Sequence, residues 1–374
     1  MDSIEIPTAI KTLSLGNNLN DGGAAVYVDN NSVGRLIVQY IPELIELEQG
    51  EPGDFAEYIN VNVGRGPIGE SLRVGLSQLE NVTKEQILID SSGLNRIKLL
   101  PLMVGAKSVV TVQGDFPGYS LAASIKGISH HEIPCQIGAK TLSPQVVADV
   151  VTNLDSPVVF LSMPIINPGQ TAINLEIAKA ILKANDTAII VIDAAYKRAV
   201  KNSEDYVRFA LNNPRVVYLN VAAKDLGACG ARICWMIATP ELLNRIKSGI
   251  CPYPVPTQAA RFISRLSLRS DLIARIHEVQ AEAKEIYREW LAVSGLRYID
   301  GDGPWVLIYL GVYCSKIVEQ LINDHQIFTQ DQSNKVSNLD GWIRISSSVP
   351  CQAKKVVKAM REIIGGSEAI SLLN

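Results

Sequence analysis

Short apolar runs that alternate with helical patterns constrain the fold of this chain more than any other feature. Residues 174–184 show an amphipathic helical pattern between two of these runs. Apolar strands separated by helices predict an α/β protein with a mainly parallel sheet covered by helices on both faces. The runs that predict strands are residues 108–113, 157–164, 187–196, 216–221 and 232–238.

Polar side chains stand at the ends of three of these runs. Asn167 lies just past one run, Asp193 lies near the end of the next, and Lys224 follows a third. In open parallel sheets, ligands bind at the carboxyl ends of the strands. We therefore expect these three side chains to face a common ligand.

The 374 residues are enough for a large domain and a smaller one. Residues 1–64 are expected to form an N-terminal segment that makes substrate or dimer contacts, and residues 65–256 are expected to form the large domain. A long helical pattern over residues 257–293 precedes two further apolar runs, at 304–310 and 342–348. Residues 257–374 are therefore expected to form a linking helix and a small α/β domain.

The stretch VYLNVAAKDLGACGARICW, residues 217–235, has the composition of a cofactor site. Lys224 follows a β-rich run, and a lysine near apolar walls loses its charge easily and can form an imine with an aldehyde. Gly227 and Gly230 allow a tight turn close to a ligand. Arg232 can bind phosphate through paired hydrogen bonds. An aldehyde cofactor that carries a phosphate, pyridoxal 5′-phosphate (PLP), would use both side chains.

Two further features have both a ligand-binding and an ordinary structural interpretation. The strand ILID at 87–90 runs through SSG into a helix, so the amides of Ser92, Gly93 and Leu94 could hold an anion. The alternative is a simple helix cap by Ser91 or Ser92. Asp193 ends the run IIVID, and a buried carboxylate needs a cation such as a protonated pyridine nitrogen. Tyr196 could reach the same ligand. The alternative is a helix-capping aspartate with a core tyrosine.

Composition excludes several other classes of protein. The net charge of −3 gives no broad support for binding nucleic acid. The six cysteines form no Cys-x-x-Cys pair, which favours free thiols in a reducing cytoplasm over disulfides or a metal site. No apolar run reaches the roughly 18 residues of a membrane span. The first residues show no secretory signal, so we expect a cytoplasmic protein without a membrane partner.

Six motifs occur in an order that resembles the fold-type I PLP-dependent enzymes, the aspartate-aminotransferase-like group. The resemblance covers roughly residues 65–360 and implies the fold, the cofactor and a homodimer. It implies that Lys224 binds the cofactor and moves the Cα proton, and that Asp193 pairs with the pyridine nitrogen. Asn167 and Tyr196 would contact the phenolic oxygen, Asn167 would also reach the substrate, and Phe116 would stack on the ring. The motifs are SSG, DFPGY, INPGQ, VIDAAY, AAKDLGACGAR and WIRIS.

The same resemblance assigns the phosphate and the substrate carboxylate. Arg232 and the turn at Ser92, Gly93 and Leu94 would hold the phosphate. Arg344 resembles the arginine that binds the substrate α-carboxylate in a bidentate pair. Its alternative is an arginine on a surface strand.

The chain departs from the family pattern near the lysine, in the Asn-Pro motif and at the N-terminus, and the N-terminal departure resembles a subgroup that acts on arginine. Val221, Ala222 and Ala223 replace the hydroxyl residues that commonly serve the phosphate, and the Asn-Pro motif is shortened to NPGQT. The N-terminal LSLGNNLNDGGA resembles a subgroup that includes an arginine oxidase and the cyclodehydratase of guanitoxin biosynthesis. In the oxidase, an aspartate-glycine step at the place of Asp21 helps to bind the guanidinium. The oxidase also has an acidic residue at the place of Val221.

The activity that this resemblance implies is the conversion of γ-hydroxy-L-arginine to L-enduracididine. The Cα proton is removed, the γ-hydroxyl leaves, and the guanidine closes a five-membered ring. The alternatives are an aminotransferase of an amino acid and a 2-oxo acid, an arginine oxidase, or a regulatory protein that retains the fold without chemistry. The intact Lys224, Asp193 and Arg232 argue against the last alternative.

Overall fold

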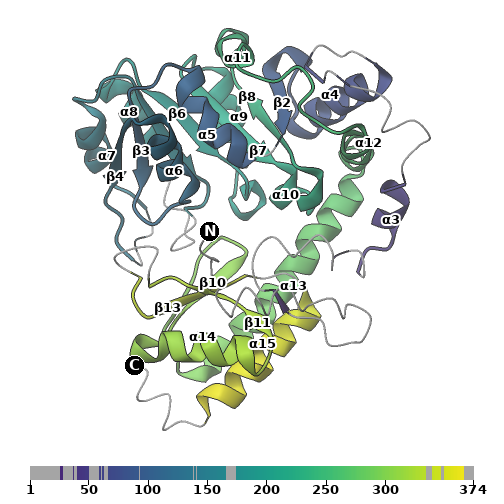
Figure 1. The fold of residues 1–374 in the computed structure, drawn as a ribbon, viewed down its shortest axis with the longest axis vertical. Helices are drawn as coiled ribbons and strands as arrows, with labels where there is room; N and C mark the ends of the chain where they lie inside the picture. The colour runs from purple at the N-terminus through teal and green to yellow at the C-terminus, as the bar shows by residue number, and fades with distance from the viewer. Residues whose placement is uncertain are drawn as a thin grey trace, which may run out of the picture.

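The computed structural model arranges the chain in two layered units joined by one long helix (Figure 1). Most of the chain from residue 66 onward is placed, together with a few segments before it. The structure describes residues 26–27, 37, 40–49, 59, 61–62, 66–91, 93–137, 139, 141–165, 174–333, 339–346 and 349–365.

A seven-stranded sheet forms the centre of the larger unit, in the order β2-β8-β7-β6-β5-β3-β4. Strand β8 runs antiparallel to both of its neighbours, and the other described pairs are parallel. The expected mainly parallel sheet is thus confirmed. The strands are β2 Ile87–Ser91, β3 Ser108–Val112, β4 Ser129–Ile133, β5 Pro157–Ser162, β6 Ile189–Asp193, β7 Val216–Val221 and β8 Ile233–Ile237.

Helices cover both faces of this sheet because most of its strands are apolar on both sides. Ile190 and Ile192 of β6 belong to one core, whereas Ile189 and Val191 belong to the other. The first face is covered by α4 Pro67–Glu80, α7 Pro144–Val151, α8 Leu175–Ala184, α9 Ser203–Leu211 and α12 Thr257–Leu266. The second face is covered by α5 Gly93–Met103, α6 Gly118–Lys126 and α11 Pro240–Lys247.

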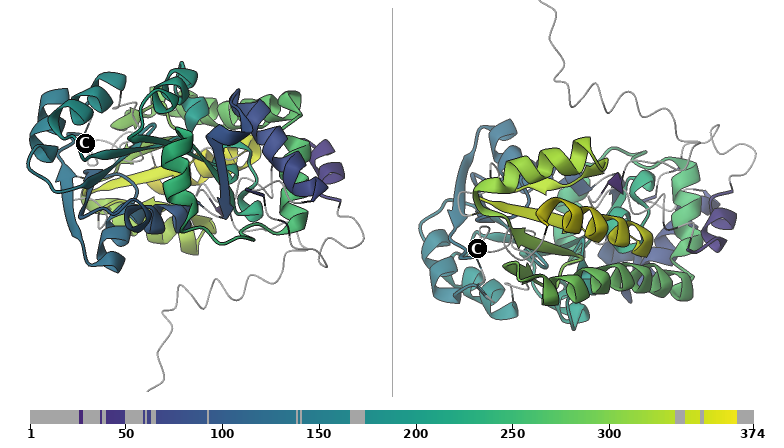
Figure 2. Two further views of the ribbon diagram at one scale, coloured as in Figure 1. Left: turned by 90° about the horizontal axis from the view of Figure 1, so that it is seen from above. Right: turned by 90° about the horizontal axis from the view of Figure 1, so that it is seen from below.

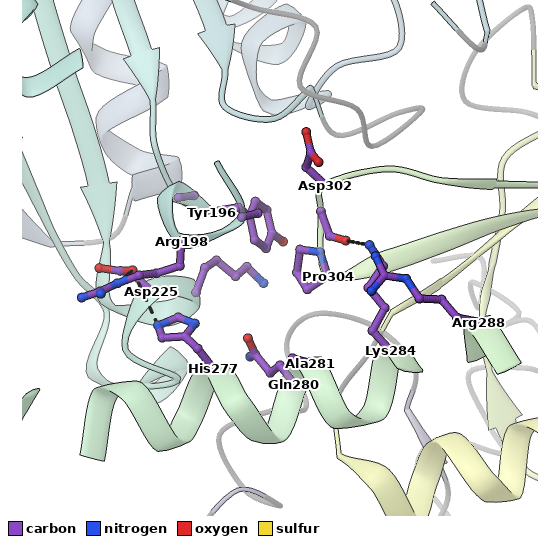
Figure 3. Close-up of a pocket in the computed structure, with 14 residues that line it drawn as sticks. Tyr196, Arg198, Asp225, His277, Gln280, Ala281, Lys284, Arg288, Asp302 and Pro304 are labelled. Atoms are coloured by element: carbon purple, nitrogen blue, oxygen red, sulfur yellow. Dashed lines mark hydrogen bonds and ion pairs between the residues drawn. The ribbon is translucent and has the colours of Figure 1, made fainter. Parts of the chain in front are cut away.

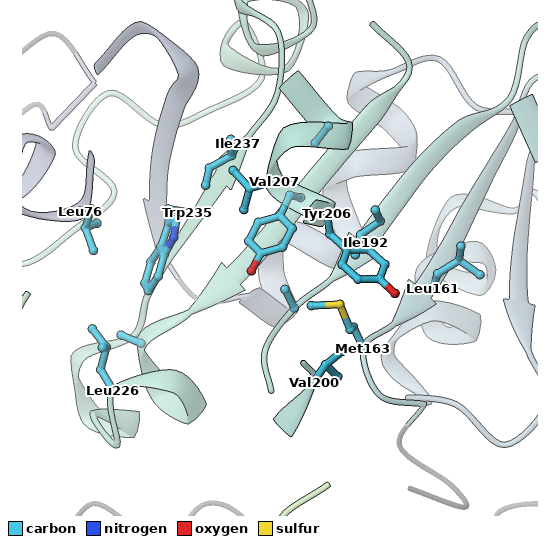
Figure 4. Close-up of a cluster of buried hydrophobic side chains, with 14 of the residues drawn as sticks. Leu76, Leu161, Met163, Ile192, Val200, Tyr206, Val207, Leu226, Trp235 and Ile237 are labelled. Carbon is cyan, nitrogen blue, oxygen red and sulfur yellow. The ribbon is translucent and has the colours of Figure 1, made fainter. Parts of the chain in front are cut away.

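The core on the first face is continuous from α4 to the middle of the sheet (Figure 4). Leu76 of α4, Trp235 of β8 and Ile192 of β6 all lie in it, and none of the three side chains is more than 1% exposed. We call this side of the sheet the α4 face and the opposite side the α5 face.

The smaller unit has a four-stranded antiparallel sheet packed against helices (Figure 2). Its strand order is β12-β13-β10-β9, and β11 Ile327–Phe328 pairs with β1 Val26–Tyr27. The four strands are β9 Tyr298–Asp300, β10 Trp305–Tyr309, β12 Gln330–Asp331 and β13 Trp342–Ser346. The helices are α14 Cys314–Asn323 and α15 Pro350–Ile364, together with the end of α13 Ser270–Ser294.

One expectation about helices needs correction. The pattern over 257–293 forms two helices, α12 and α13, because the chain leaves helical geometry at Arg269, whose φ is −111° and ψ is 72°. Before the large unit, the structure describes one short helix, α3 Glu43–Leu47. Among the described helices, none is long and apolar enough to cross a membrane.

Candidate active site

A cavity of about 320 Å³ lies between the carboxyl edge of the large sheet and helix α13 (Figure 3). Its walls come from the turn after β6, from the short helix α10 Ala222–Asp225, from α13, and from the loop before β10. Tyr196 and Lys224 both line it, so two of the expected site residues meet in one cavity.

Lys224 reaches this cavity because β7 ends directly before it. The strand is buried as far as Asn220, and after Val221 the small residues Ala222 and Ala223 begin α10. The carbonyl of Ala222 accepts hydrogen bonds from the amides of Leu226 and Ala228, at 3.2 and 3.0 Å. Gly227 then adopts a φ of +64°, which a side chain would disfavour.

Asp193 ends β6 on the α5 face, and its side chain is almost completely buried. One carboxylate oxygen accepts a hydrogen bond from the Tyr119 hydroxyl at 2.9 Å, and the other accepts one from the Ala195 amide at 3.0 Å. Burial raises the pKa of this carboxyl group. Among the described residues, no lysine, arginine or histidine forms an ion pair with it.

Tyr119 is a site residue that the sequence analysis missed, although it ends the DFPGY motif. Its ring stacks on Phe160 with centroids 4.6 Å apart, and the ring of Phe116 meets it edge-on at 5.5 Å. Its hydroxyl also lies 2.6 Å from the Ser162 hydroxyl. Tyr119 therefore contacts both Phe116 and Asp193 and fixes their relative positions.

The first turn of α5 lies against the end of β7. A Cβ atom on Gly93 would lie 2.4 Å from Val221 Cγ1, so only glycine fits there without a shift. A Cβ atom on Gly118 would lie 2.9 Å from Leu94 Cδ1 and 2.3 Å from Phe116 Cε1. Gly93 thus lies against the strand end that precedes Lys224, while Leu94 and Phe116 meet at Gly118. The N-terminus of α5 at this place favours an anion.

Arg232 lies at the same edge of the sheet as the end of β7, because β8 is antiparallel to β7 and starts where β7 ends. It is exposed, has a φ of 53°, and directly precedes the first residue of β8. Two residues later, Cys234 lies opposite Val221 in the sheet. Burial raises the pKa of Cys234 to about 12, so this thiol stays protonated beside the strand end.

Arg344 is buried in β13 of the smaller unit and does not lie on a surface strand. Its guanidinium carbon is 5.6 Å from the centroid of the Trp305 ring. The same indole meets the ring of Tyr196 at 4.8 Å in an edge-to-face contact. Trp305 thus connects the arginine of the smaller unit to the tyrosine of the large sheet.

The cavity also contains charged residues that the sequence analysis did not single out. Lys284 and Arg288 of α13 both pair with Asp300, at 2.8 and 2.6 Å. Asp302 lines the cavity beside Pro304, and no described lysine or arginine forms an ion pair with it. The linking helix showed no motif that marked it as a cavity wall.

Three expected site residues lie outside the described part of the chain. They are Ser92, Asn167 and Asp21.

The described residues fit PLP. A buried carboxylate without a described cation partner is what a protonated pyridine nitrogen would neutralise. Lys224 at the cavity wall supplies the amine, and the first turn of α5 with Arg232 supplies groups for a phosphate.

Comparison with known proteins places the chain in a family. Residues 77–363 match the profile of aminotransferase class I and II, so the chain belongs to this family and its cofactor is PLP. Histidinol-phosphate aminotransferase of Xanthomonas campestris pv. campestris is 28% identical over 306 residues, which is 79% of this chain and 83% of that protein.

Solved structures share the fold. Histidinol-phosphate aminotransferase from Sinorhizobium meliloti, in complex with pyridoxal-5′-phosphate, matches with a TM-score of 0.76 at 19% identity. The match covers 89% of this chain and 88% of that one. L-threonine-O-3-phosphate decarboxylase from Porphyromonas gingivalis matches with a TM-score of 0.70 at 16% identity, over 86% and 95% of the two chains.

Proposed function

We propose that this PLP-dependent enzyme converts γ-hydroxy-L-arginine to L-enduracididine with loss of water. Asp302 carries the proposal, because it is a carboxylate without a described cation partner on the wall of the cavity that contains Lys224. A carboxylate matches the forked donors of a guanidinium. The N-terminal segment with Asp21, which resembles arginine-modifying enzymes, supports the same substrate.

The proposed cofactor contacts are those that the family resemblance implies. Bound PLP would supply an electron sink for negative charge that develops at Cα. Asp193 would accept the ring N–H, and Phe116 would lie against the ring. Tyr196 and Asn167 would donate to the phenolic oxygen. Arg232 would hold the phosphate together with the amides of Ser92, Gly93 and Leu94.

The substrate is held and converted by Arg344 of β13 together with Lys224 and Asp302 of the cavity wall. Arg344 holds the substrate carboxylate, and Lys224 removes the proton from Cα and then one from Cβ. The γ-hydroxyl leaves with a proton as water, and a guanidine nitrogen bonds to Cγ and loses its own proton. Protons then return to Cβ and Cα, so that the substrate minus one water equals the product. Asp302 holds the guanidine near Cγ, which replaces a bimolecular encounter.

Transamination is the second candidate. The family and the curated relatives favour it, since aminotransferases are the proteins that this chain matches in sequence. Lys224, Asp193 and Arg344 would have the same roles in transamination, with a 2-oxo acid as the second substrate. We further propose that the chain works as a homodimer in the cytoplasm, as the fold-type I resemblance implies.

Mass spectrometry of products from arginine and γ-hydroxyarginine tests the proposal. We expect a product lighter than γ-hydroxyarginine by one water, formed without a 2-oxo acid and without oxygen uptake. Amine transfer to 2-oxoglutarate or pyruvate would establish the aminotransferase instead. Peroxide formation from arginine would establish an oxidase.

The variant Asp302→Asn tests the guanidinium contact within the same assay. We expect KM for γ-hydroxyarginine to rise by up to about fivefold, because Asp302 is exposed and an exposed ion pair contributes about 0.2–1 kcal/mol. Glu289→Gln on the solvent side of α13 is a matched control. An unchanged KM in Asp302→Asn would contradict the proposed contact.

A further inference from the structure

Four charged side chains gather beside Lys224, and three of them are buried. Glu80 and Asp225 supply carboxylates, while Lys197 and Arg198 supply cations. The side chains of Glu80, Lys197 and Asp225 are 3%, 7% and 0% exposed, and that of Arg198 is 43% exposed. We call these four residues the charge cluster.

The charged side chains of the charge cluster contact one another, and His277 Nε2 of α13 also lies 3.9 Å from Asp225 Oδ1. Lys197 Nζ lies 2.7 Å from Glu80 Oε1 and 3.4 Å from Asp225 Oδ2, and Arg198 Nε lies 3.4 Å from Asp225 Oδ1. Asn220 Nδ2 donates to both carboxylates, at 3.2 and 3.1 Å, and Trp235 Nε1 donates to Glu80 at 2.8 Å. Since Asn220 and Trp235 are fully buried, the arrangement is fixed from the α4 face of the sheet.

The cluster is attached to both sides of the proposed site. Asp225 directly follows Lys224, and Lys197 directly follows Tyr196. Taking a charge out of water costs several kcal/mol, and apolar residues of the same volume often stabilise a fold equally well. Arg198 and Asp225 line the same cavity as Lys224, so charges of the cluster are placed where they can act on that lysine.

The charged and titratable groups around the cavity come from several elements. The turn after β6 supplies Tyr196 and Arg198, α10 supplies Asp225, α13 supplies His277, Lys284 and Arg288, and the loop before β10 supplies Asp302. Lys284 and Arg288 share Asp300. Burial lowers the pKa of His277, so its imidazole is neutral at neutral pH.

Asp225 would by itself favour a protonated Lys224, because a nearby negative charge stabilises a cation. Two cations offset this effect. Although burial opposes its charge, the carboxylates of Asp225 and Glu80 raise the pKa of Lys197, so Lys197 stays cationic. With Arg198 also charged, two positive and two negative charges balance.

We propose that the charge cluster is a positioning device that holds α10 against the turn after β6 and keeps Asp225 from stabilising Lys224 as a cation. The inference rests on the proposed role of Lys224 in binding the cofactor. The residues of the charge cluster act through Lys224 and do not touch the reacting atoms, so they are positioning residues.

The pH dependence of the visible absorbance of the PLP-bound enzyme tests the inference. Arg198→Gln removes a positive charge, so the pH midpoint of the absorbance change should rise. Asp225→Asn removes a negative charge, so the midpoint should fall. Each shift should be roughly one pH unit, since unit charges about 10 Å apart interact by about 1–2 kcal/mol at an effective dielectric constant of about 20.

A rescue separates charge balance from simple structural support. Lys197→Met should raise the midpoint, and adding Glu80→Gln should return it close to the wild-type value because the net charge is restored. Lys179→Met is a matched control, because Lys179 pairs with Glu176 on the exposed side of α8. Far-ultraviolet circular dichroism shows whether each variant is folded.

Opposite shifts of the pH midpoint in Arg198→Gln and Asp225→Asn, together with recovery of the midpoint in the double variant Lys197→Met with Glu80→Gln, would support the inference. Shifts of the same sign, or none, in folded Arg198→Gln and Asp225→Asn would overturn it. Lys224→Ala distinguishes this failure from failure of the proposed function. A pH transition that survives in Lys224→Ala would remove the role of Lys224 and the inference with it, whereas its loss would leave the proposed role of Lys224 intact.

Discussion

The carboxyl group of Asp193 is buried at the end of β6 with two hydrogen-bond donors and no described cation. Because burial raises its pKa, the ionised form is disfavoured in the folded protein without cofactor. Tyr119 donates to the carboxylate, and Phe160 and Ser162 fix that tyrosine. The group is therefore oriented before the cofactor binds.

Asp193→Asn should have opposite effects on apoenzyme stability and cofactor affinity. A folded-state pKa above the unfolded value means that stability from this group is present at low pH and is lost as pH rises. The variant should thus stabilise the apoenzyme at neutral pH, with the difference vanishing in acid. PLP affinity should fall by about tenfold or more.

Thermal unfolding of the apoenzyme between acid and neutral pH measures the first effect, and titration with PLP measures the second. Equal PLP affinity in the variant and the wild type would contradict the pairing of Asp193 with the ring nitrogen.

At the scale of elements, the junction between α5 and β7 shapes the site. Val221 ends β7, and its methyl group fills the space above Gly93. The strand end and the helix N-terminus are therefore fitted to one another. Strand β2 ends at Ser91 and α5 begins at Gly93, so the strand and helix that the sequence predicted on either side of this turn are both present.

Gly93→Ala should weaken PLP binding, because the new Cβ atom would overlap Val221 Cγ1 and move the first turn of α5. Overpacking of this kind costs about 1–3 kcal/mol. The double variant Gly93→Ala with Val221→Ala removes the overlapping methyl group and should recover most of the affinity. Fluorescence titration of the apoenzyme measures both, and a double variant as weak as the single one would refute the steric explanation.

At the scale of the whole molecule, α13 belongs to both hydrophobic cores. Ile276 and Val279 pack in the core of the large sheet, while Ala283, Tyr287 and Trp290 pack in that of the smaller unit. Trp305 adds a second connection, between Tyr196 and Arg344. The two units are therefore joined on both sides of the cavity.

Trp305→Phe should weaken substrate binding more than cofactor binding. A smaller ring reduces the contact with Arg344, and a cation–π contact contributes about 0.5–2 kcal/mol, so KM for the amino acid should rise up to about tenfold. PLP affinity should fall by less than KM rises, because Trp305 reaches the proposed cofactor contacts only through its edge-to-face contact with Tyr196. Steady-state kinetics and PLP titration check the two outcomes, and a parallel loss of both would count against Trp305 as a support for Arg344.

The sequence by itself determined the sheet and the identity of the cofactor chemistry. Apolar runs specify buried strands locally, and motif residues such as Lys224 and Asp193 stand at strand ends wherever those strands lie. The edge strand β4 was missed because SHHEI is polar and half exposed, and so carries no apolar run.

Only the tertiary structure decided which distant side chains meet. Tyr119 and Asp193 are 74 residues apart, and Lys197 and Glu80 are 117 apart. Their contacts depend on strand order, on which face each residue occupies, and on how helices pack across the sheet. Local patterns hold no such information, because a polar residue on a buried face looks the same in sequence whether or not its partner lies opposite.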